Sequence, residues 1–246
     1  MSFQKISVDL HIHSVLSPCG DVMMTPGNLV GMAKINGLDA VALTDHNAMQ
    51  NIPAALRMGK EYEVVVIPGM ELETAEEIHV VCLFENVEKL REFQQIVTDS
   101  YGGEIPGNRP EIFGKQLIYN EEDEECGELE RMLLIPSKIS IDDVFGIVEN
   151  LGGIAFPAHV DRDSYSVLTT LGMLPYGYKN GFVEISCECD RETLLKTYPE
   201  LEKYKLLPSS DAHYIDKIQE AGGAELLVEE LSVKGVIEAL KNNRIV

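Results

Sequence analysis

Short apolar segments rich in β-branched residues recur along this chain, and helical patterns separate most of them. The alternation favours parallel βα units over a β-sandwich, because parallel neighbours need a crossover connection that is usually a helix. The expected strands cover residues 5–11, 39–44, 63–70, 78–84, 153–158, 181–186, 205–209 and 224–229. Seven or eight such strands predict an α/β fold of the (β/α) barrel type.

Capping signals place helices between these strands. Thr25 offers a capping hydroxyl and Pro26 follows at the first helical position, so we expect a helix that begins here and ends near Gly37. Ser140 is a second cap, with two aspartates in the first turn, where carboxylates favour the helix dipole. Helices are therefore expected at 25–37, 51–61, 86–98, 140–151, 190–198 and 231–242.

Residues 99–138 break this rhythm. The segment is rich in glycine and proline and contains the acidic run EEDEE at 121–125, which we expect to be solvated. A long interruption inside a compact domain is usually functional or mobile, so we expect an inserted flap. Since the chain shows no internal repeat and no low-complexity linker, we expect residues 1–246 to form one domain that carries this flap.

Composition suggests a globular, unsecreted protein. Of the 246 residues, 45% are hydrophobic, which suffices for a substantial core. No apolar segment approaches the ~20 residues that span a bilayer, and the N-terminus lacks the pattern of a signal peptide. The five cysteines show no disulfide spacing, so we expect a cytoplasmic protein without a membrane partner.

The formal net charge of −21 bears on possible ligands. An acidic chain repels a nucleic-acid duplex, which is bound by basic surfaces, and we therefore expect no duplex nucleic acid as partner. A small phosphorylated substrate would need a local positive centre, which bound divalent cations would supply.

The six histidines share one positional property: each lies in or just beyond an expected strand. They stand at positions 11, 13, 46, 79, 159 and 213. The C-terminal strand ends of a parallel barrel open on one face, where such enzymes keep their active sites. Each histidine alone is more often structural than a ligand, but independent roles would scatter them, so we expect them to converge.

Carboxylates accompany these histidines at the same strand ends. The motif DLHIHS sets His11 and His13 two residues apart, so both rings point to one side of a strand and can coordinate one ion. The motifs LTDHN, PGMELE and SSDAH add Asp45, Glu71, Glu73 and Asp211. Imidazoles mixed with carboxylates suit Zn, Mn or Fe rather than calcium, and the number of candidate ligands predicts two or three divalent ions.

These motifs, in this order, make the chain similar to the PHP (polymerase and histidinol phosphatase) family. The resemblance rests on DLHIHS, TDHN, PGMELE, PAH and DAH and covers nearly the whole chain. It implies a distorted (β/α)7 TIM-like barrel and, usually, three metals. The implied ligands are His11, His13, Glu71 and Asp211 for the first ion, Glu71, His79 and His159 for the second, and His46 and His213 for the third.

One ligand of the third ion departs from the family pattern. Some relatives carry a histidine or aspartate five or six residues beyond the second histidine of the first motif, where this chain has Pro18 and Cys19. We expect Asp21 to substitute, with Cys19 as the competing choice.

The resemblance implies a metal-dependent phosphoesterase, and we expect hydrolysis of a small phosphate monoester by a metal-bridging hydroxide, since divalent cations lower a water pKa from ~15.7 to about 7. Arg162 is expected to bind a phosphate oxygen, unless it is a surface arginine paired with Asp161 or Asp163. Asp45 is expected to orient a ligand or to shuttle a proton.

Two other functions suit the same ligand set. One is a non-catalytic regulatory or accessory PHP module, since ligands alone do not establish turnover. The other is a metal-dependent amidohydrolase or lactonase, because the same activated water can attack carbon.

Overall fold

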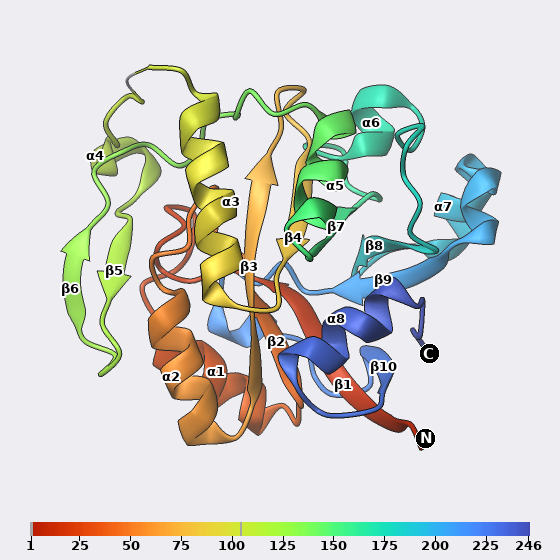
Figure 1. The fold of residues 1–246 in the computed structure, drawn as a ribbon, viewed down its shortest axis with the longest axis horizontal. Helices are drawn as coiled ribbons and strands as arrows, with labels where there is room; N and C mark the ends of the chain where they lie inside the picture. The colour runs from red at the N-terminus through yellow and green to blue at the C-terminus, as the bar shows by residue number, and fades with distance from the viewer. Residues whose placement is uncertain (1, 104) are drawn as a thin grey trace.

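The computed structural model describes residues 2–103 and 105–246 and has a mixed α/β fold (Figure 1). The strands are β1 (Gln4–Ile12), β2 (Ala40–Leu43), β3 (Val65–Glu73), β4 (His79–Leu83), β5 (Leu117–Tyr119), β6 (Glu125–Glu128), β7 (Ile154–Pro157), β8 (Phe182–Ser186), β9 (Lys205–Ser209) and β10 (Ala224–Val228). The helices are α1 (Pro26–Ile35), α2 (Ile52–Tyr62), α3 (Val87–Ser100), α4 (Pro110–Phe113), α5 (Ile141–Asn150), α6 (Val167–Leu171), α7 (Arg191–Thr197) and α8 (Val233–Lys241), with short 3-10 turns η1 (Pro199–Lys203) and η2 (Ile215–Lys217).

The strands and helices expected from the sequence are present, with boundaries shifted by a few residues. The Thr25 side chain accepts a hydrogen bond from the backbone N–H of Asn28 at the start of α1, and that of Ser140 accepts one from Asp143 at the start of α5. Both caps satisfy amide groups that lack an intrahelical partner. Among the described residues, no helix is both long and apolar enough to cross a bilayer.

Six strands form one sheet in the order β10-β1-β2-β3-β4-β7, and β8 pairs with β9 in a second sheet. The expectation of uniformly parallel strands holds for β1, β2 and β3 and for the β8–β9 pair. It is wrong for β4 and β10, which run antiparallel to their neighbours. The link between β3 and β4 is only residues 74–78, too short for the crossover that parallel strands require.

The two sheets curl toward each other without a continuous hydrogen-bonded ring in the described part of the chain. A single parallel bridge, between Ile12 and Ala212, joins the end of β1 to the residues after β9. The mixed α/β class is therefore observed, and the complete (β/α)7 barrel stays an expectation from the resemblance.

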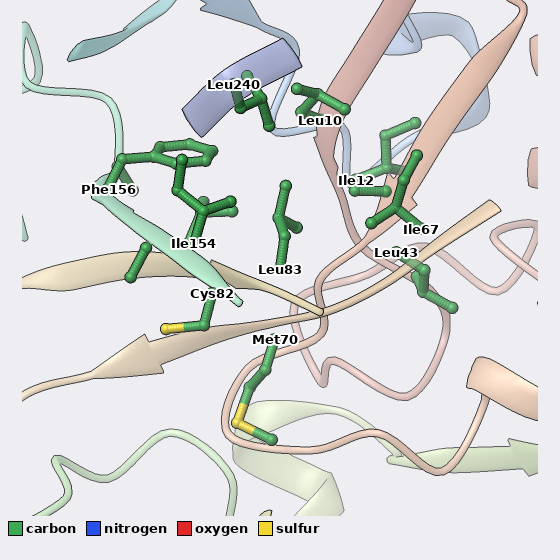
Figure 2. Close-up of a cluster of buried hydrophobic side chains, with 14 of the residues drawn as sticks. Leu10, Ile12, Leu43, Ile67, Met70, Cys82, Leu83, Ile154, Phe156 and Leu240 are labelled. Atoms are coloured by element: carbon green, nitrogen blue, oxygen red, sulfur yellow. The ribbon is translucent and has the colours of Figure 1, made fainter. Parts of the chain in front are cut away.

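The hydrophobic core lies against the outer face of the strands, under the helices. Strand residues alternate between two faces, so Leu10 and Ile12 point away from the histidine between them. Figure 2 shows both in one buried cluster with Leu83, Phe156 and, from α8, Leu240. Burial of such side chains contributes roughly 1.5–3 kcal/mol each, which fixes the strands whose opposite face carries the polar residues.

Residues 99–138 contain the short helix α4 and the hairpin β5–β6, which lies beside α2 and apart from β8 and β9 in Figure 1. Most of the acidic run at 121–125 is exposed, as expected. Asp123 is the exception: its carboxylate accepts hydrogen bonds from the Gly27 amide (2.8 Å) and the Thr25 hydroxyl (2.9 Å). The hairpin is thereby attached to the start of α1.

The same segment supports the turn after β2. The Asn47 side-chain amide donates to the Leu133 carbonyl (2.9 Å), and the Arg131 guanidinium donates to the Asn47 carbonyl (2.8 Å). The Asn47 side-chain oxygen accepts from the backbone N–H of Glu73 (3.1 Å). Residues 99–138 therefore pack behind the histidine that precedes Asn47, and they fix its position relative to β3.

Candidate metal centre

All six histidines gather in one cluster, although they are scattered over some 200 residues of the chain. Ring centroids lie 4.2 Å apart for His13 and His213, 5.5 Å for His79 and His159, and 5.9 Å for His11 and His159. His79 does not end its strand; it begins β4. Because β4 is antiparallel to β3, His79 pairs with Glu73 and still reaches the same end of the sheet.

Glu71 occupies the centre of the cluster and is almost fully buried. One or other of its carboxylate oxygens lies 2.9–3.3 Å from a ring nitrogen of five histidines, namely His11, His13, His46, His79 and His159. Burial alone would raise the pKa of Glu71, but the surrounding rings hold it well below its ordinary value. A single carboxylate is thus placed to bridge several ligand sets.

Asp211 is the second carboxylate of the cluster. Its Oδ1 lies 3.3 Å from His11 Nε2 and 3.1 Å from His13 Nε2, while Oδ2 contacts the Arg162 guanidinium at 2.5 Å. Burial opposes ionisation, yet the two rings keep the pKa of Asp211 below its ordinary value. The carboxylate is therefore ionised at neutral pH and available as a ligand.

The protonation states of the rings differ across the cluster. At His13 and His46 burial lowers the ring pKa, but the nearby carboxylates outweigh it and raise the pKa to about 9. Burial prevails at His79 and His213, where the pKa falls to about 4 and about 3. The protons on the first pair balance the buried carboxylates, a role that a bound cation would take over with release of those protons.

Several ligand atoms in the cluster lack a partner among the described residues. Glu71 Oε1, Asp211 Oδ1 and His159 Nδ1 are buried and make no hydrogen bond. Leaving such atoms unsatisfied costs roughly 1–3 kcal/mol each, so their accumulation at one point calls for an additional group. Imidazole nitrogens and carboxylate oxygens that face one another fit a transition-metal ion.

Three groups of ligand atoms each lie within 4.8 Å of one another, and together they contain the first-ion set implied by the resemblance. The groups are His11, His13, Glu71 and Asp211; His46, Glu71 and His79; and His13, His46 and His213. His159, implied for the second ion, lies outside the second group, although its Nε2 is 3.3 Å from Glu71 Oε1. The implied residues are thus together, with His13 and His46 shared between groups.

The loop after β1 presents its two candidate ligands differently. The Asp21 carboxylate accepts a hydrogen bond from the Met23 backbone N–H (2.9 Å), which closes a tight turn, and Asp21 belongs to none of the three groups. Cys19 lines the same cleft as His213 and, like Asp21, belongs to none of the three groups.

Asp45 lies behind the cluster. Its carboxylate accepts hydrogen bonds at 2.7 Å from the Ser14 amide, the Ser14 hydroxyl and the Ser17 hydroxyl. Ser17 Oγ in turn contacts His13 Nδ1 at 2.9 Å. These contacts favour the orienting role over the proton shuttle, because both carboxylate oxygens are already engaged.

Arg162 pairs with Asp211, and with neither of its neighbours in sequence. Asp161 instead accepts a hydrogen bond from the Ser186 amide at the end of β8 (2.8 Å). Arg162 is therefore at the edge of the cluster, with its side chain about 41% exposed and accessible to a ligand.

Two residues of the cluster were missed in the sequence. Glu184, in β8, contacts His11 Nδ1 at 2.9 Å; its signal was a lone acid within an apolar strand. Tyr165 stacks on the ring of His79 with centroids 4.4 Å apart, and its carbonyl accepts from the His79 backbone N–H. No local pattern distinguishes this tyrosine, which lies in an irregular loop.

Backbone conformation is unusual at the same place. Asn47, His159 and Asp211 have positive φ angles of 48°, 30° and 49°. Non-glycine residues rarely adopt this region, because the conformation costs roughly 1–3 kcal/mol for each residue. The surrounding contacts therefore hold these positions against their local preference.

A cleft of about 500 Å³ opens beside the cluster. Its lining includes Asp211 and His213 from the cluster, together with Arg162, Lys217 and Tyr214. A cavity of about 580 Å³ lies elsewhere, between α5 and β7, and no histidine lines it. The smaller cleft is the approach to the cluster, because it combines ligand atoms of the cluster with basic side chains.

Among curated proteins, the chain is similar to an uncharacterized protein of Methanocaldococcus jannaschii, with 34% identity over 93 residues that cover 34% of this chain and 54% of that protein. It is also 42% identical over 64 residues to a PolC-type DNA polymerase III of Bacillus subtilis, covering 26% of this chain and 4% of the polymerase. The matched region thus spans about half of the first relative and a small part of the second.

Two solved structures share the fold. The lesion-specific endonuclease PfuEndoQ of Pyrococcus furiosus matches 97% of this chain and 56% of its own, with a TM-score of 0.69 and 18% identity. A candidate metal-dependent phosphoesterase of Bifidobacterium adolescentis matches 95% of each chain, with a TM-score of 0.57 and 18% identity. Likeness at this identity shows the fold and leaves the activity open.

The expected exclusion of duplex nucleic acid is wrong for this fold. Endonuclease Q, with a TM-score of 0.69 to this chain, forms a complex with a 27-mer duplex substrate that has an abasic lesion at the active site. The expectation relied on the total charge of −21, which does not describe the local field in a cleft. Here Arg162 and Lys217 lie in the cleft itself.

The family model of the PHP domain matches residues 9–151, more than half of the chain. This range contains the motifs DLHIHS, TDHN and PGMELE, and four of the clustered histidines. The remaining two, with Asp211, join them from β7 and β9 in the structure. The chain therefore belongs to the PHP domain family.

Proposed function

We propose that this chain is a metal-dependent phosphoesterase that hydrolyses phosphate monoesters at the histidine cluster. One observation carries the proposal: a single buried carboxylate, Glu71, faces ring nitrogens of five histidines, next to a cleft with two basic side chains. Divalent ions held by these ligands would supply an acidic water and positive charge for the phosphoryl oxygens.

The side chains around the ligands have separate tasks in this proposal. Arg162 would exchange part of its contact with Asp211 for a phosphoryl oxygen, to which its planar fork is well matched. Lys217 and Tyr214, further along the cleft, would contact the leaving group. Asp45 and Ser17 would keep His13 oriented. The enclosed position of Glu71 excludes bulk water and strengthens the electrostatic interactions within the site.

For the third ion we propose Cys19, rather than Asp21, as the ligand that joins His46 and His213. The Asp21 carboxylate is engaged in its own turn, whereas Cys19 lines the cleft together with His213. A thiolate ligand favours zinc or iron over manganese. Cobalt-loaded protein would then show a thiolate-to-cobalt absorption band that disappears in Cys19→Ser and persists in Asp21→Asn; persistence of the band in Cys19→Ser would contradict this assignment.

The activity is tested by phosphate release from a panel of phosphomonoesters, with manganese, zinc or iron, and with chelator as the blank. Asp211→Ala and His159→Ala remove implied ligands and are expected to lower kcat/KM at least ~100-fold, more than loss of an orienting partner typically costs. Asp161→Asn serves as the matched control, because Asp161 is a half-buried carboxylate that lies outside the cluster. Unchanged hydrolysis in both alanine variants would refute the proposal.

A second substrate class has support from the comparisons. The relatives and structural neighbours include a DNA polymerase and a DNA endonuclease, so phosphodiesters in nucleic acid are the alternative to small monoesters. Labelled single-stranded and duplex oligonucleotides belong in the same panel. Shortened or nicked products without free phosphate would favour the diester reaction, and hydrolysis of lactones or amides alone would favour a carbon-centred hydrolase.

A further inference from the structure

Glu184 is a buried carboxylate to which no role has been given so far. It lies in β8 between Val183 and Ile185, both fully buried, and only about 1% of its surface is exposed. Burial of a carboxylate costs several kcal/mol unless specific partners compensate for it. The partners of Glu184 therefore show what the carboxylate does in the cluster.

The first partner of Glu184 is the ring of His11. Glu184 Oε1 and His11 Nδ1 are 2.9 Å apart, and since a carboxylate oxygen accepts, the ring donates from Nδ1. The other nitrogen, Nε2, then faces the cluster. It lies 3.2 Å from Glu71 Oε1 and 3.3 Å from Asp211 Oδ1. Glu184 thus selects which nitrogen of His11 is free to bind an ion.

The second partner is the backbone of His159. The same Oε1 accepts the His159 backbone N–H at 2.9 Å, and the Glu184 carbonyl accepts the Val160 N–H at 3.0 Å. These bonds hold His159 at a φ of 30°, a conformation that a histidine rarely adopts. They direct its ring toward Glu71, with His159 Nε2 3.3 Å from Glu71 Oε1.

The family resemblance assigns His11 and His159 to different ion positions, and a nitrogen of each ring lies close to the same oxygen of Glu71, at 3.2 and 3.3 Å. Asp45 offers a contrast, because its carboxylate reaches the ring of His13 and the backbone N–H of His46 only indirectly, through the hydroxyl of Ser17. Glu184 alone among the described carboxylates outside the ligand set contacts two of the clustered histidines directly.

We propose that Glu184 is a positioning residue that sets two neighbouring ion positions at once, through the ring tautomer of His11 and the strained backbone of His159. The proposal rests on the metal centre proposed above. It assigns Glu184 no contact with substrate and no contact with an ion.

The test compares the parent chain with Glu184→Ala, Glu184→Gln and Asp161→Asn. Asp161 is the matched control, because it also joins β8 to the loop after His159 but makes no hydrogen bond to a described histidine. Manganese binding to chelator-treated protein is measured by counting free Mn²⁺ in electron paramagnetic resonance. The His11 tautomer is read from ring ¹⁵N resonances of the zinc-loaded protein, because the nearby carboxylates raise the pKa of the metal-free ring and keep both of its nitrogens protonated.

Glu184→Ala is expected to weaken binding of both ions roughly 10–100-fold and to give a mixture of His11 tautomers. Glu184→Gln keeps an acceptor but loses its charge, so a smaller loss in affinity is expected, with the tautomer retained. Asp161→Asn is expected to bind manganese as the parent does. Loss of affinity at the first ion alone would contradict a shared role.

Parent-like affinity and tautomer in Glu184→Ala would overturn the inference while leaving the metal centre intact. If the alanine variant fails to fold, Glu184→Gln decides: affinity equal to that of Asp161→Asn would equally overturn it. A parent chain that binds no manganese, zinc or iron would refute the metal centre itself, and this inference with it.

Discussion

Replacement of Glu71 by glutamine tests the shared carboxylate most directly. The change keeps the shape of the side chain and removes the charge that faces five histidines. Glu71 belongs to two of the three groups of ligand atoms, whereas His213 belongs only to the third. We therefore expect Glu71→Gln to abolish ion binding at two positions and His213→Ala to spare both.

The expected size follows from the linkage of binding to folding. An ion present at 100 times its dissociation constant stabilises the folded chain by about 2.7 kcal/mol. For a domain of this size each kcal/mol raises the melting temperature by about 2–4 °C, so two ions give roughly 11–22 °C. The parent and His213→Ala should show this rise, and Glu71→Gln should lose most of it.

Scanning calorimetry with and without manganese, each against a chelator blank, measures the difference within each variant. This design removes any effect that the substitution has on the metal-free chain. A manganese-induced rise in Glu71→Gln equal to that of the parent would refute the reasoning that one carboxylate serves two ions.

Three further changes test features outside the cluster. Cys187 is exposed, but partial desolvation of its thiol and neighbouring acidic groups raise its pKa to about 12, and the thiol donates to Gln219 Oε1 at 3.3 Å. The thiol therefore stays protonated at pH 8. We expect iodoacetamide to react with it at least ~10-fold more slowly than with a peptide thiol, and a rate that levels off near pH 9 would contradict this. Gly114 has a φ of 97° and a Cβ there would overlap the Pro18 carbonyl, so Gly114→Ala should cost roughly 1–3 kcal/mol, and a melting temperature within a degree of the parent would argue against it. Asp123→Ala removes the acceptor of the Gly27 amide and should cost about 1 kcal/mol in urea unfolding, which an unchanged midpoint would disprove.

The sequence predicts the elements of this fold better than their directions. Apolar β-branched segments and capping residues identify the strands and helices, because these signals are local. The direction of β4 depends on whether residues 74–78 form a turn or a crossover, and this link is too short for a crossover. His79 was correctly placed near the other histidines, for the wrong reason: it begins an antiparallel strand.

The ligand residues could be proposed from the sequence, but their supporting partners could not. Histidine and carboxylate motifs at strand ends carry a recognisable pattern. Glu184 acts across the fold, because it contacts His11 at a separation of 173 residues. Ser17 is close to His13 in sequence, but its role depends on a loop that also brings it to Asp45, 28 residues away. The choice between Asp21 and Cys19 likewise depends on a turn whose closure by the aspartate is visible only in three dimensions.

The positive φ angles of Asn47, His159 and Asp211 have a consequence for the metal-free chain. A glycine would relax any of these positions, but at His159 and Asp211 it would delete a proposed ligand, so the strain must remain in the folded state. Hydrogen exchange in chelator should therefore be fastest in the peptide groups around these residues, ahead of the rest of β7 and β9. Binding of cations would slow exchange at these peptide groups. The local structure around the three residues would then become fully stable only when the ions bind.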